Sequence, residues 1–255
     1  DVMSALVLSF IMGLGINYGN LQSLRNLAVE FKDVVARVIA KAIIPLLPLY
    51  IFGIFLNMTS SGQVYRIMVV FAYIIMVIFV LHILILLYSY AVAGAITRRN
   101  PLRLLANMLP AYLTALGTSS SAATIPVTFA QTIRNKVSEG VAGFVVPLCA
   151  TIHMSGSAMK ITCCALTICL LNGFGTFLHF ILILGIVMVA APGVPGGSIM
   201  AALAPLASIL GFDADAQALM IALYIAMDSF GTACNVTGDG AIALIINKMF
   251  GRKDE

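Results

Sequence analysis

The sequence predicts an all-α membrane protein, and three observations support this prediction. Of the 255 residues, 61% are hydrophobic and 9% are charged, and the mean hydropathy is +1.07. No water-soluble domain of this length needs so much apolar surface. Apolar runs of bilayer length alternate with half-length runs that turn at small polar residues. Two aspartates also lie inside a long apolar run near the C-terminus.

The N-terminal part, residues 1–66, is expected to supply scaffold-type transmembrane helices. Residues 2–16 are apolar but lack the basic region that opens a signal peptide, so we expect a chain joined partway through, with transmembrane segments before it. A polar, basic linker is predicted to about Lys41. The run at 34–58 is long enough to span, and its two prolines are expected to kink it.

The remaining residues, 67–255, are predicted to form a second unit. Residues 67–97 are an unbroken apolar run, long enough to cross a bilayer with tilt. Residues 104–130 then form two half-length apolar stretches around GTSSSAATIP (117–126). This pattern predicts a re-entrant hairpin, which enters and leaves the membrane on the same side.

The pattern of hairpin and interrupted helix then repeats. Residues 141–171 form a full-length run broken by HMSGS (153–157). A second hairpin is predicted over 176–210, turning at PGVPGGS, and the last run, 217–248, is predicted to break at NVTGD (235–239). Paired interruptions in two halves indicate an inverted-repeat transporter with a binding site at the breaks. The alternative is two glycine kinks in helices that merely bend.

Charge placement favours the same topology. If the first hairpin opens to the cytoplasm and the second to the outside, nearly all Arg and Lys residues of the loops fall on the cytoplasmic side. The outer side then holds Arg66, Asp213 and Asp215. This is the bias expected of a multi-pass protein of the cell inner (plasma) membrane.

The stretch AMDSFGTACNVTGDG (226–240) carries the candidate site. Asp228 and Asp239 are eleven residues apart, so they differ by only about 20° around a helix axis, and Asn235 lies on the same stripe. Ionisable groups at membrane depth mark an ion or substrate site by default.

Four motifs, SSSAATIP, PLCATIHMSGSAM, PGVPGGSIMA and MDSFGTACNVTGDG, resemble in order and spacing the signature regions of the dicarboxylate/amino acid:cation symporters. This family includes the glutamate and neutral amino acid transporters. The resemblance covers nearly the whole chain. It implies a homotrimer in the lipid bilayer, in which each protomer moves a transport domain past a scaffold like an elevator. It also implies sodium as a coupling ion and not as a prosthetic group.

The resemblance assigns roles to individual residues. Asp228 matches the aspartate that holds the substrate α-amino group, and Ser121 matches a serine near the α-carboxylate. The other implied substrate contacts are Ser157, Val194, Ser198, Gly231, Thr232 and Asn235. The implied cation ligands are Asp239, the main-chain carbonyls of Cys149, Thr151 and Asn235, and the positions of His153 and Ser155.

Two departures from the family pattern shape the functional expectation. Members with acidic substrates carry an arginine where this chain has Gly231, or alternatively Ser119. An acidic side chain would therefore be buried without a cationic partner, at a cost of several kcal/mol. We expect a small neutral amino acid such as serine, threonine or alanine, with an acidic amino acid or dicarboxylate as the alternative.

The second departure concerns the coupled ions. An Asn-Met-Asp-Gly-Thr motif is replaced by residues 153–157, which introduces His153 and Ser155, and Lys160 follows on the same helix. A fixed ammonium is able to stand in for one bound cation, and histidines titrate near neutral pH. Fewer sodium ions, with a proton in place of one, are the hypothesis. The alternative is that Lys160 points into an aqueous crevice and His153 is a hydrogen-bonded packing residue.

Other classes of function have weaker support. The serines at 119–121 have no activating base nearby in sequence, and Asp228 and Asp239 share one helix, so an intramembrane hydrolase is a low alternative and no enzyme is expected. A passive pore is a further alternative. The five cysteines lie in apolar runs and are interpreted as free thiols. No surface typical of nucleic-acid binding is present.

Overall fold

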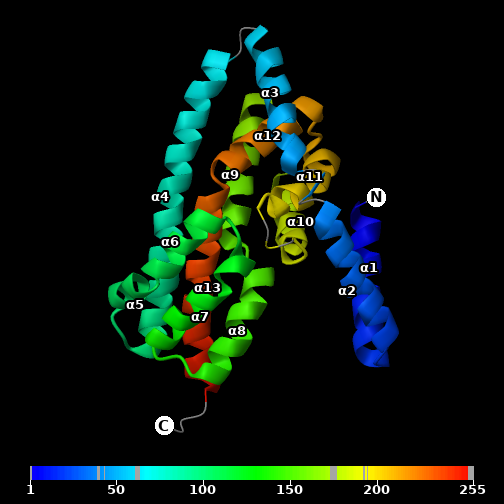
Figure 1. Ribbon diagram of the computed structural model, residues 1–255. Helices are drawn as coiled ribbons and strands as arrows, with labels where there is room; N and C mark the ends of the chain where they lie inside the picture. Colours follow the sequence, from blue (N-terminus) through cyan, green and yellow to red (C-terminus); the bar gives the residue numbers. More distant parts are fainter. Residues whose placement is uncertain are drawn as a thin grey trace.

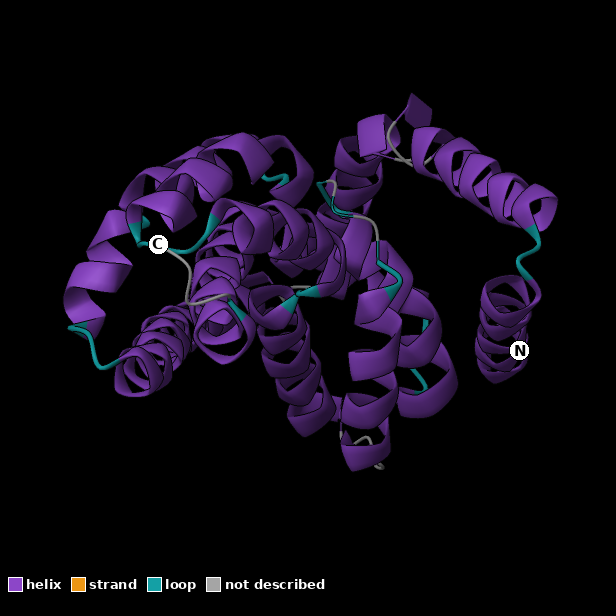
Figure 2. Ribbon diagram, turned by 90° about the horizontal axis from the view of Figure 1, so that it is seen from below, coloured by secondary structure: helices purple, strands orange, loops and turns teal. Residues whose placement is uncertain are grey.

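The computed structural model describes residues 2–38, 41–42, 44–60, 64–172, 177–191, 193 and 195–251. The regular structure of these residues is helical, and Figure 2 shows short loops between the helices and no strand among them. Three helical stretches of the described chain are long and apolar enough to cross a membrane: Val69–Thr97, Glu139–Cys169 and Asp228–Phe250. The predicted all-α membrane architecture is confirmed at this level.

The N-terminal helices differ from the sequence prediction. They are α1 (Val2–Gly19), α2 (Gln22–Val38) and α3 (Ile44–Ser60). The predicted linker is wrong, because apolar residues recur every three or four positions through α2, which is the period of an amphipathic helix. The expected single span over 34–58 is also wrong, because α2 ends and α3 begins inside it. In Figure 1, α1 and α2 lie to one side of the other helices.

Helix α4 (Val64–Thr97) agrees with the predicted span at 67–97. It leads through α5 (Pro101–Asn107) into the predicted first hairpin, in which α6 (Leu109–Thr118) packs on α7 (Ser121–Arg134). The tip consists of Ser119, which has a left-handed backbone, and Ser120, whose hydroxyl accepts the N–H of Ala123 and so caps α7.

The first predicted interruption is confirmed. Helix α8 (Glu139–Ile152) ends and α9 (Ser155–Asn172) begins on either side of His153 and Met154. The second hairpin follows, with α10 (Phe177–Val189) packed on α11 (Gly197–Leu210). Val194, at its tip, lies outside the described residues.

The second interruption falls elsewhere than predicted. Helix α12 (Ala214–Ala226) ends before Met227, and α13 (Asp228–Phe250) then continues without a break through 235–239. The glycines there admit neighbouring side chains instead of unwinding the helix. A Cβ on Gly238 would lie 2.6 Å from the His153 ring, and one on Gly240 would lie 2.8 Å from Met108 and the Tyr90 hydroxyl.

Helix α13 occupies the centre of this bundle and contacts α4, α6, α7, α8 and α9 (Figure 1). Two apolar cores flank it. One joins α4 to α9–α12 through residues such as Ile78, Phe180 and Tyr224, and the other joins α4–α6 and α8 to α13 around Tyr90 and Met108. The buried polar residues of α9 and α13 lie where these two cores meet.

Candidate functional site

The interruption between α8 and α9 positions the first half of the site. The first N–H groups of a helix have no partner within that helix. Here the Asn235 side chain of α13 supplies one, because its Oδ1 accepts the N–H of Gly156 at 2.7 Å and of Ser157 at 3.4 Å. Only glycine fits at position 156, since a Cβ would lie 2.6 Å from the Gly231 carbonyl. Helices α9 and α13 are therefore held in close contact at the break.

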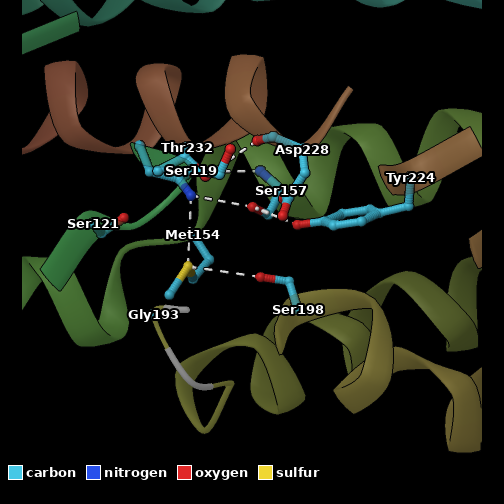
Figure 3. Close-up of a pocket in the computed structure, with 10 residues that line it drawn as sticks. Ser119, Ser121, Met154, Ser157, Gly193, Ser198, Tyr224, Asp228 and Thr232 are labelled. Carbon is cyan, nitrogen blue, oxygen red and sulfur yellow. Dashed lines mark hydrogen bonds between the residues drawn. The ribbon is translucent and has the colours of Figure 1, made fainter. Parts of the chain in front are cut away.

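A small polar cavity, which we call the central cavity, lies beside this contact. Hydroxyl groups dominate its lining, and Figure 3 shows them converging from both hairpin tips and from α13. The space that a water-sized group is able to occupy there is ≈ 10 Å³, room for about one water molecule. Its lining residues are Ser119, Ser121, Met154, Ser157, Gly193, Ser198, Tyr224, Asp228, Thr232 and Asn235.

The two hairpin tips meet over the central cavity. The Ser120 hydroxyl of the first tip donates to the Gly193 carbonyl of the second at 3.1 Å. The Gly196 N–H, at the start of α11, donates to Asp228 Oδ2 at 2.7 Å. In Figure 3, Ser198 approaches from the side opposite to Asp228. The second hairpin is thus closed directly on the α13 carboxylate.

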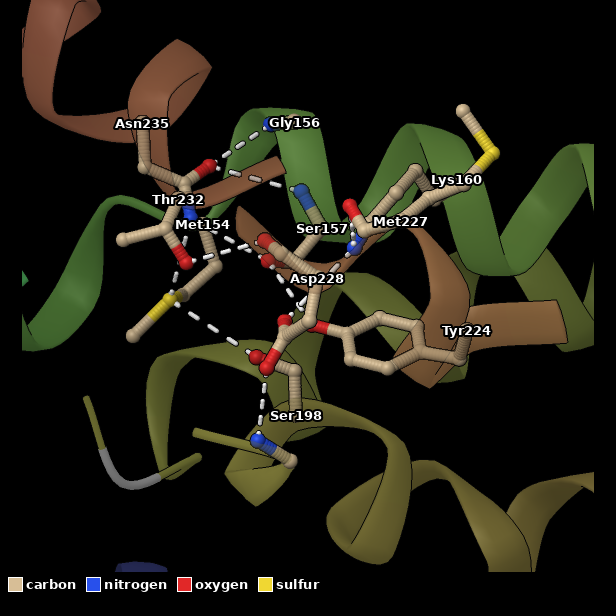
Figure 4. Close-up of polar contacts among 11 residues, drawn as sticks. Met154, Gly156, Ser157, Lys160, Ser198, Tyr224, Met227, Asp228, Thr232 and Asn235 are labelled. Carbon is tan, nitrogen blue, oxygen red and sulfur yellow. Dashed lines mark hydrogen bonds and ion pairs between the residues drawn. The ribbon is translucent and has the colours of Figure 1, made fainter. Parts of the chain in front are cut away.

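The other oxygen of Asp228 faces a lysine. Lys160 Nζ lies 3.6 Å from Asp228 Oδ1, donates to the Met227 carbonyl at 2.9 Å and stands 3.7 Å from the centre of the Tyr224 ring (Figure 4). The Lys160 side chain is 1% exposed. The interpretation that Lys160 points into an aqueous crevice is therefore wrong in this structure.

The second carboxylate of α13, Asp239, also has a partner within the chain. His153 Nδ1 lies 2.7 Å from Asp239 Oδ1, and the two side chains are 21% and 1% exposed. The Tyr90 hydroxyl donates to the Thr237 carbonyl at 2.8 Å, close by on the same helix. In the described part of the chain, no three His, Cys, Asp or Glu side chains gather as a metal site.

Comparison with known proteins places the chain in a family. A family model described as the sodium:dicarboxylate symporter family matches residues 1–249. The chain belongs to this family. It is 35% identical to excitatory amino acid transporter 5 of Homo sapiens over 181 residues, which cover 68% of this chain and 31% of that protein. It is 31% identical to excitatory amino acid transporter 1 of Rattus norvegicus over 258 residues, covering 94% and 46%. The chain thus spans less than half the length of these relatives.

Membership in the symporter family confirms the recognition made from the four motifs. The family is one of multi-pass membrane transporters and not of enzymes, and its description names sodium as the coupling ion. This excludes the hydrolase alternative at the level of the family.

Most of the residues expected to contact substrate come together in the structure. Six of them line the central cavity: Ser121, Ser157, Ser198, Asp228, Thr232 and Asn235. Gly231 instead borders Lys160, and Val194 is outside the described residues. Met154 and Tyr224 line the cavity without having been predicted. Tyr224 lies on α12, beyond the break at Met227, and no sequence signal identifies it.

Several of the expected cation ligands already have hydrogen-bond partners in the structure. The Cys149 carbonyl accepts the His153 N–H at 2.8 Å, and the Thr151 hydroxyl donates to the Leu148 carbonyl at 2.8 Å. Ser155 is the first residue of α9 and is partly buried. Because α13 is continuous, the Asn235 carbonyl belongs to its helical hydrogen-bond ladder. It is not freed by an unwound turn, as the sequence interpretation required.

Proposed function

We propose that the protein couples sodium entry to the uptake of a small neutral amino acid such as serine, threonine or alanine. The observation that supports this is the lining of the central cavity: many hydroxyls, one carboxylate and no arginine or lysine among its described residues. Such a wall offers a partner for an ammonium group and hydrogen bonds for a carboxylate and a hydroxyl. It offers no fork-shaped donor for a second carboxylate.

In the proposed complex, the substrate ammonium takes the place of the Gly196 N–H on Asp228 Oδ2. Ser121 and neighbouring groups of the first hairpin tip bind the α-carboxylate, while Thr232 and Ser157 bind the side chain. The second hairpin, including Val194 and Ser198, acts as the lid. Since the closed cavity has room for about one water molecule, the lid must open to admit substrate.

Sodium is proposed to bind around Asp239, with Cys149, Thr151, His153, Ser155 and Asn235 as candidate ligands. Asp239 is 1% exposed, so its charge needs compensation whenever the site is buried. His153 provides a hydrogen-bonded partner in the structure. We propose that this pair takes the place of one coupled sodium ion, with a proton instead, and the alternative that His153 is only a hydrogen-bonded packing residue fits the same contact.

The transport cycle is proposed to follow the elevator scheme in a homotrimer, with the two hairpins re-entrant from opposite faces of the membrane. Residues 67–255 are assigned to the moving transport domain and residues 1–66 to the scaffold. Among the described residues, α1 and α2 have few contacts with the remaining helices, which supports that division, while α3 packs on α12.

The second candidate is an acidic amino acid or dicarboxylate symporter, because the family is described by dicarboxylates and the relatives above are named excitatory amino acid transporters. Uptake of radiolabelled serine by proteoliposomes of the full-length protein separates the two, with sodium and pH gradients imposed independently. Unlabelled serine, threonine and alanine are expected to compete, and aspartate is not. Stronger competition by aspartate than by serine would support the second candidate.

A further inference from the structure

We propose that Lys160 is a resident counter-cation of Asp228, and that it allows the unloaded site to cross the membrane. It thereby determines whether the protein performs net uptake or only exchanges one substrate molecule for another. This inference rests on the proposed function, since it concerns the return of the same transport site without substrate.

The ammonium of Lys160 is fixed at the break between α12 and α13. Three groups of different kinds surround it: the Asp228 carboxylate at 3.6 Å, the Met227 carbonyl at 2.9 Å and the Tyr224 ring at 3.7 Å (Figure 4). A carbonyl, an anion and an aromatic face are all favourable neighbours for a cation. All three neighbours of Lys160 therefore favour a positive charge at this position.

Gly231 makes room for this ammonium. A Cβ at position 231 would lie 2.7 Å from Lys160 Nζ and closer still to Lys160 Cε, the carbon bonded to that nitrogen. A side chain on Gly231 would force the Lys160 ammonium to shift from the position that it occupies beside Asp228. Lys160 and Gly231 thus form a matched pair across the α9–α13 contact.

The geometry divides the two oxygens of Asp228 between two tasks. Oδ1 lies 3.6 Å from Lys160 Nζ, while Oδ2 accepts the Gly196 N–H of the second hairpin, and the Asp228 residue lines the central cavity. Lys160 does not line the cavity, so it lies behind the carboxylate and not in the substrate's place. A substrate ammonium is able to exchange with Gly196 at Oδ2 while Lys160 stays at Oδ1.

The consequence concerns the empty site. A carboxylate that crosses a bilayer without a partner is strongly disfavoured. Without Lys160, Asp228 would need a substrate ammonium or another bound cation on every crossing, and transport would be limited to exchange. With Lys160 the unloaded pair carries no net charge, and the Gly196 N–H allows the lid to close on it. The empty site is then able to return and accept another substrate.

The test compares two transport modes of the full-length protein in proteoliposomes. Net uptake is measured as labelled serine entering empty vesicles under an inward sodium gradient. Exchange is measured as labelled serine entering vesicles preloaded with unlabelled serine at equal sodium. Lys160→Met is expected to lower net uptake about tenfold or more while exchange falls only a few-fold, because the unpaired carboxylate penalises only the empty crossing. Lys248→Met, the same change at an exposed lysine of α13, is expected to leave both modes unchanged.

Gly231→Ala provides a second route to the same result, since it displaces the ammonium without removing it. Each variant is checked for a monodisperse peak in size-exclusion chromatography. Wild-type net uptake in both Lys160→Met and Gly231→Ala would overturn the proposal. So would a parallel loss of exchange and net uptake in a monodisperse variant, because a purely structural role predicts that outcome. If the wild-type protein itself exchanges no serine, the proposed function fails, and not this inference.

Discussion

Asp228 has different partners on its two carboxylate oxygens, and this arrangement gives the residue a testable signature. Asn has the same shape but no charge, so Asp228→Asn removes the attraction for a substrate ammonium and leaves Lys160 without its anion. A hydrogen bond to a charged group contributes about 1.5–3 kcal/mol, so serine uptake is expected to fall about 10- to 100-fold. The measurement is initial-rate uptake of labelled serine into proteoliposomes.

Asp213→Asn is the matched control for that variant. Asp213 is exposed and caps α12 by accepting the Ala216 N–H at 2.9 Å, a role that Asn also performs well. Uptake by Asp213→Asn is expected to equal that of the wild type. Unchanged uptake by Asp228→Asn would remove Asp228 from the substrate site.

The contact between His153 and Asp239 predicts a link between sodium and stability. His153→Ala leaves Asp239 buried without its 2.7 Å partner, and a hydrogen bond to a charged group contributes about 1.5–3 kcal/mol. If sodium binds at Asp239, it replaces part of the lost compensation. The melting temperature of the variant in detergent is therefore expected to drop strongly in choline chloride and much less in sodium chloride.

His179→Ala is the control for the stability measurement, because His179 is exposed on α10. Its melting temperature is expected to depend on sodium as the wild type does. An equal loss of stability for His153→Ala in both salts would show that sodium does not compensate the Asp239 charge, and the proposed cation site would then be wrong.

Among the elements, α13 depends on its glycines for close packing against its neighbours. They lie at the contacts with α4, α6 and the α8–α9 break, so adding a methyl group tests packing directly. Gly240→Ala places a Cβ 2.8 Å from Met108 and the Tyr90 hydroxyl, in a core with no spare room. Overpacking of this kind costs about 1–3 kcal/mol, and we expect a corresponding loss of unfolding free energy in detergent micelles.

Gly185→Ala isolates this effect from helix propensity. Gly185 is a helical glycine on α10, and a Cβ added there would have no heavy atom of another residue within 4 Å beyond its own helical turn. Alanine is favoured over glycine in a helix by about 1 kcal/mol, so Gly185→Ala is expected to be neutral or stabilising. If Gly240→Ala stabilises to the same extent, glycine at 240 is not needed for helix contact.

These glycines also explain how far the sequence could predict the elements. The hairpins and the break at His153 were predictable, because apolar runs stop at half the bilayer length and resume after small polar residues. The break at Met227 was not predictable. The sequence pointed instead to Thr-Gly-Asp-Gly, which weakens a helix unless neighbouring side chains pack against its glycines. The same limit applies to α2. Its charged residues made the segment look like a linker, although apolar residues recur there every three or four positions.

The candidate site could be predicted from the sequence to a similar extent. The stripe of Asp228, Asn235 and Asp239 follows from helical geometry, and all three contact α9 or the break before it. The partners on the other side depend on how α9 lies against α13. The pairing of Lys160 with Asp228, and the place of Tyr224 in the central cavity, follow only from that packing.

At the scale of the whole molecule, the two flanking cores hold α13 between two hairpins, and the decisive question is which membrane face each hairpin opens to. Single cysteines introduced into a cysteine-free full-length protein answer it when labelled by a membrane-impermeant maleimide. Arg103→Cys and Lys136→Cys flank the first hairpin, and His179→Cys and Asp213→Cys flank the second; all four positions are exposed.

Two re-entrant hairpins predict a specific labelling pattern for these four positions. The variants at 103 and 136 are expected to react from the cytoplasmic side only, because nearly all basic loop residues lie on that side in this topology. The variants at 179 and 213 are expected to react from the outside only. A single crossing of the membrane in place of either hairpin would instead put the two flanking cysteines on opposite sides. That result for either hairpin would separate the tips that now meet at Ser120 and Gly193, and the central cavity would then not be the transport site.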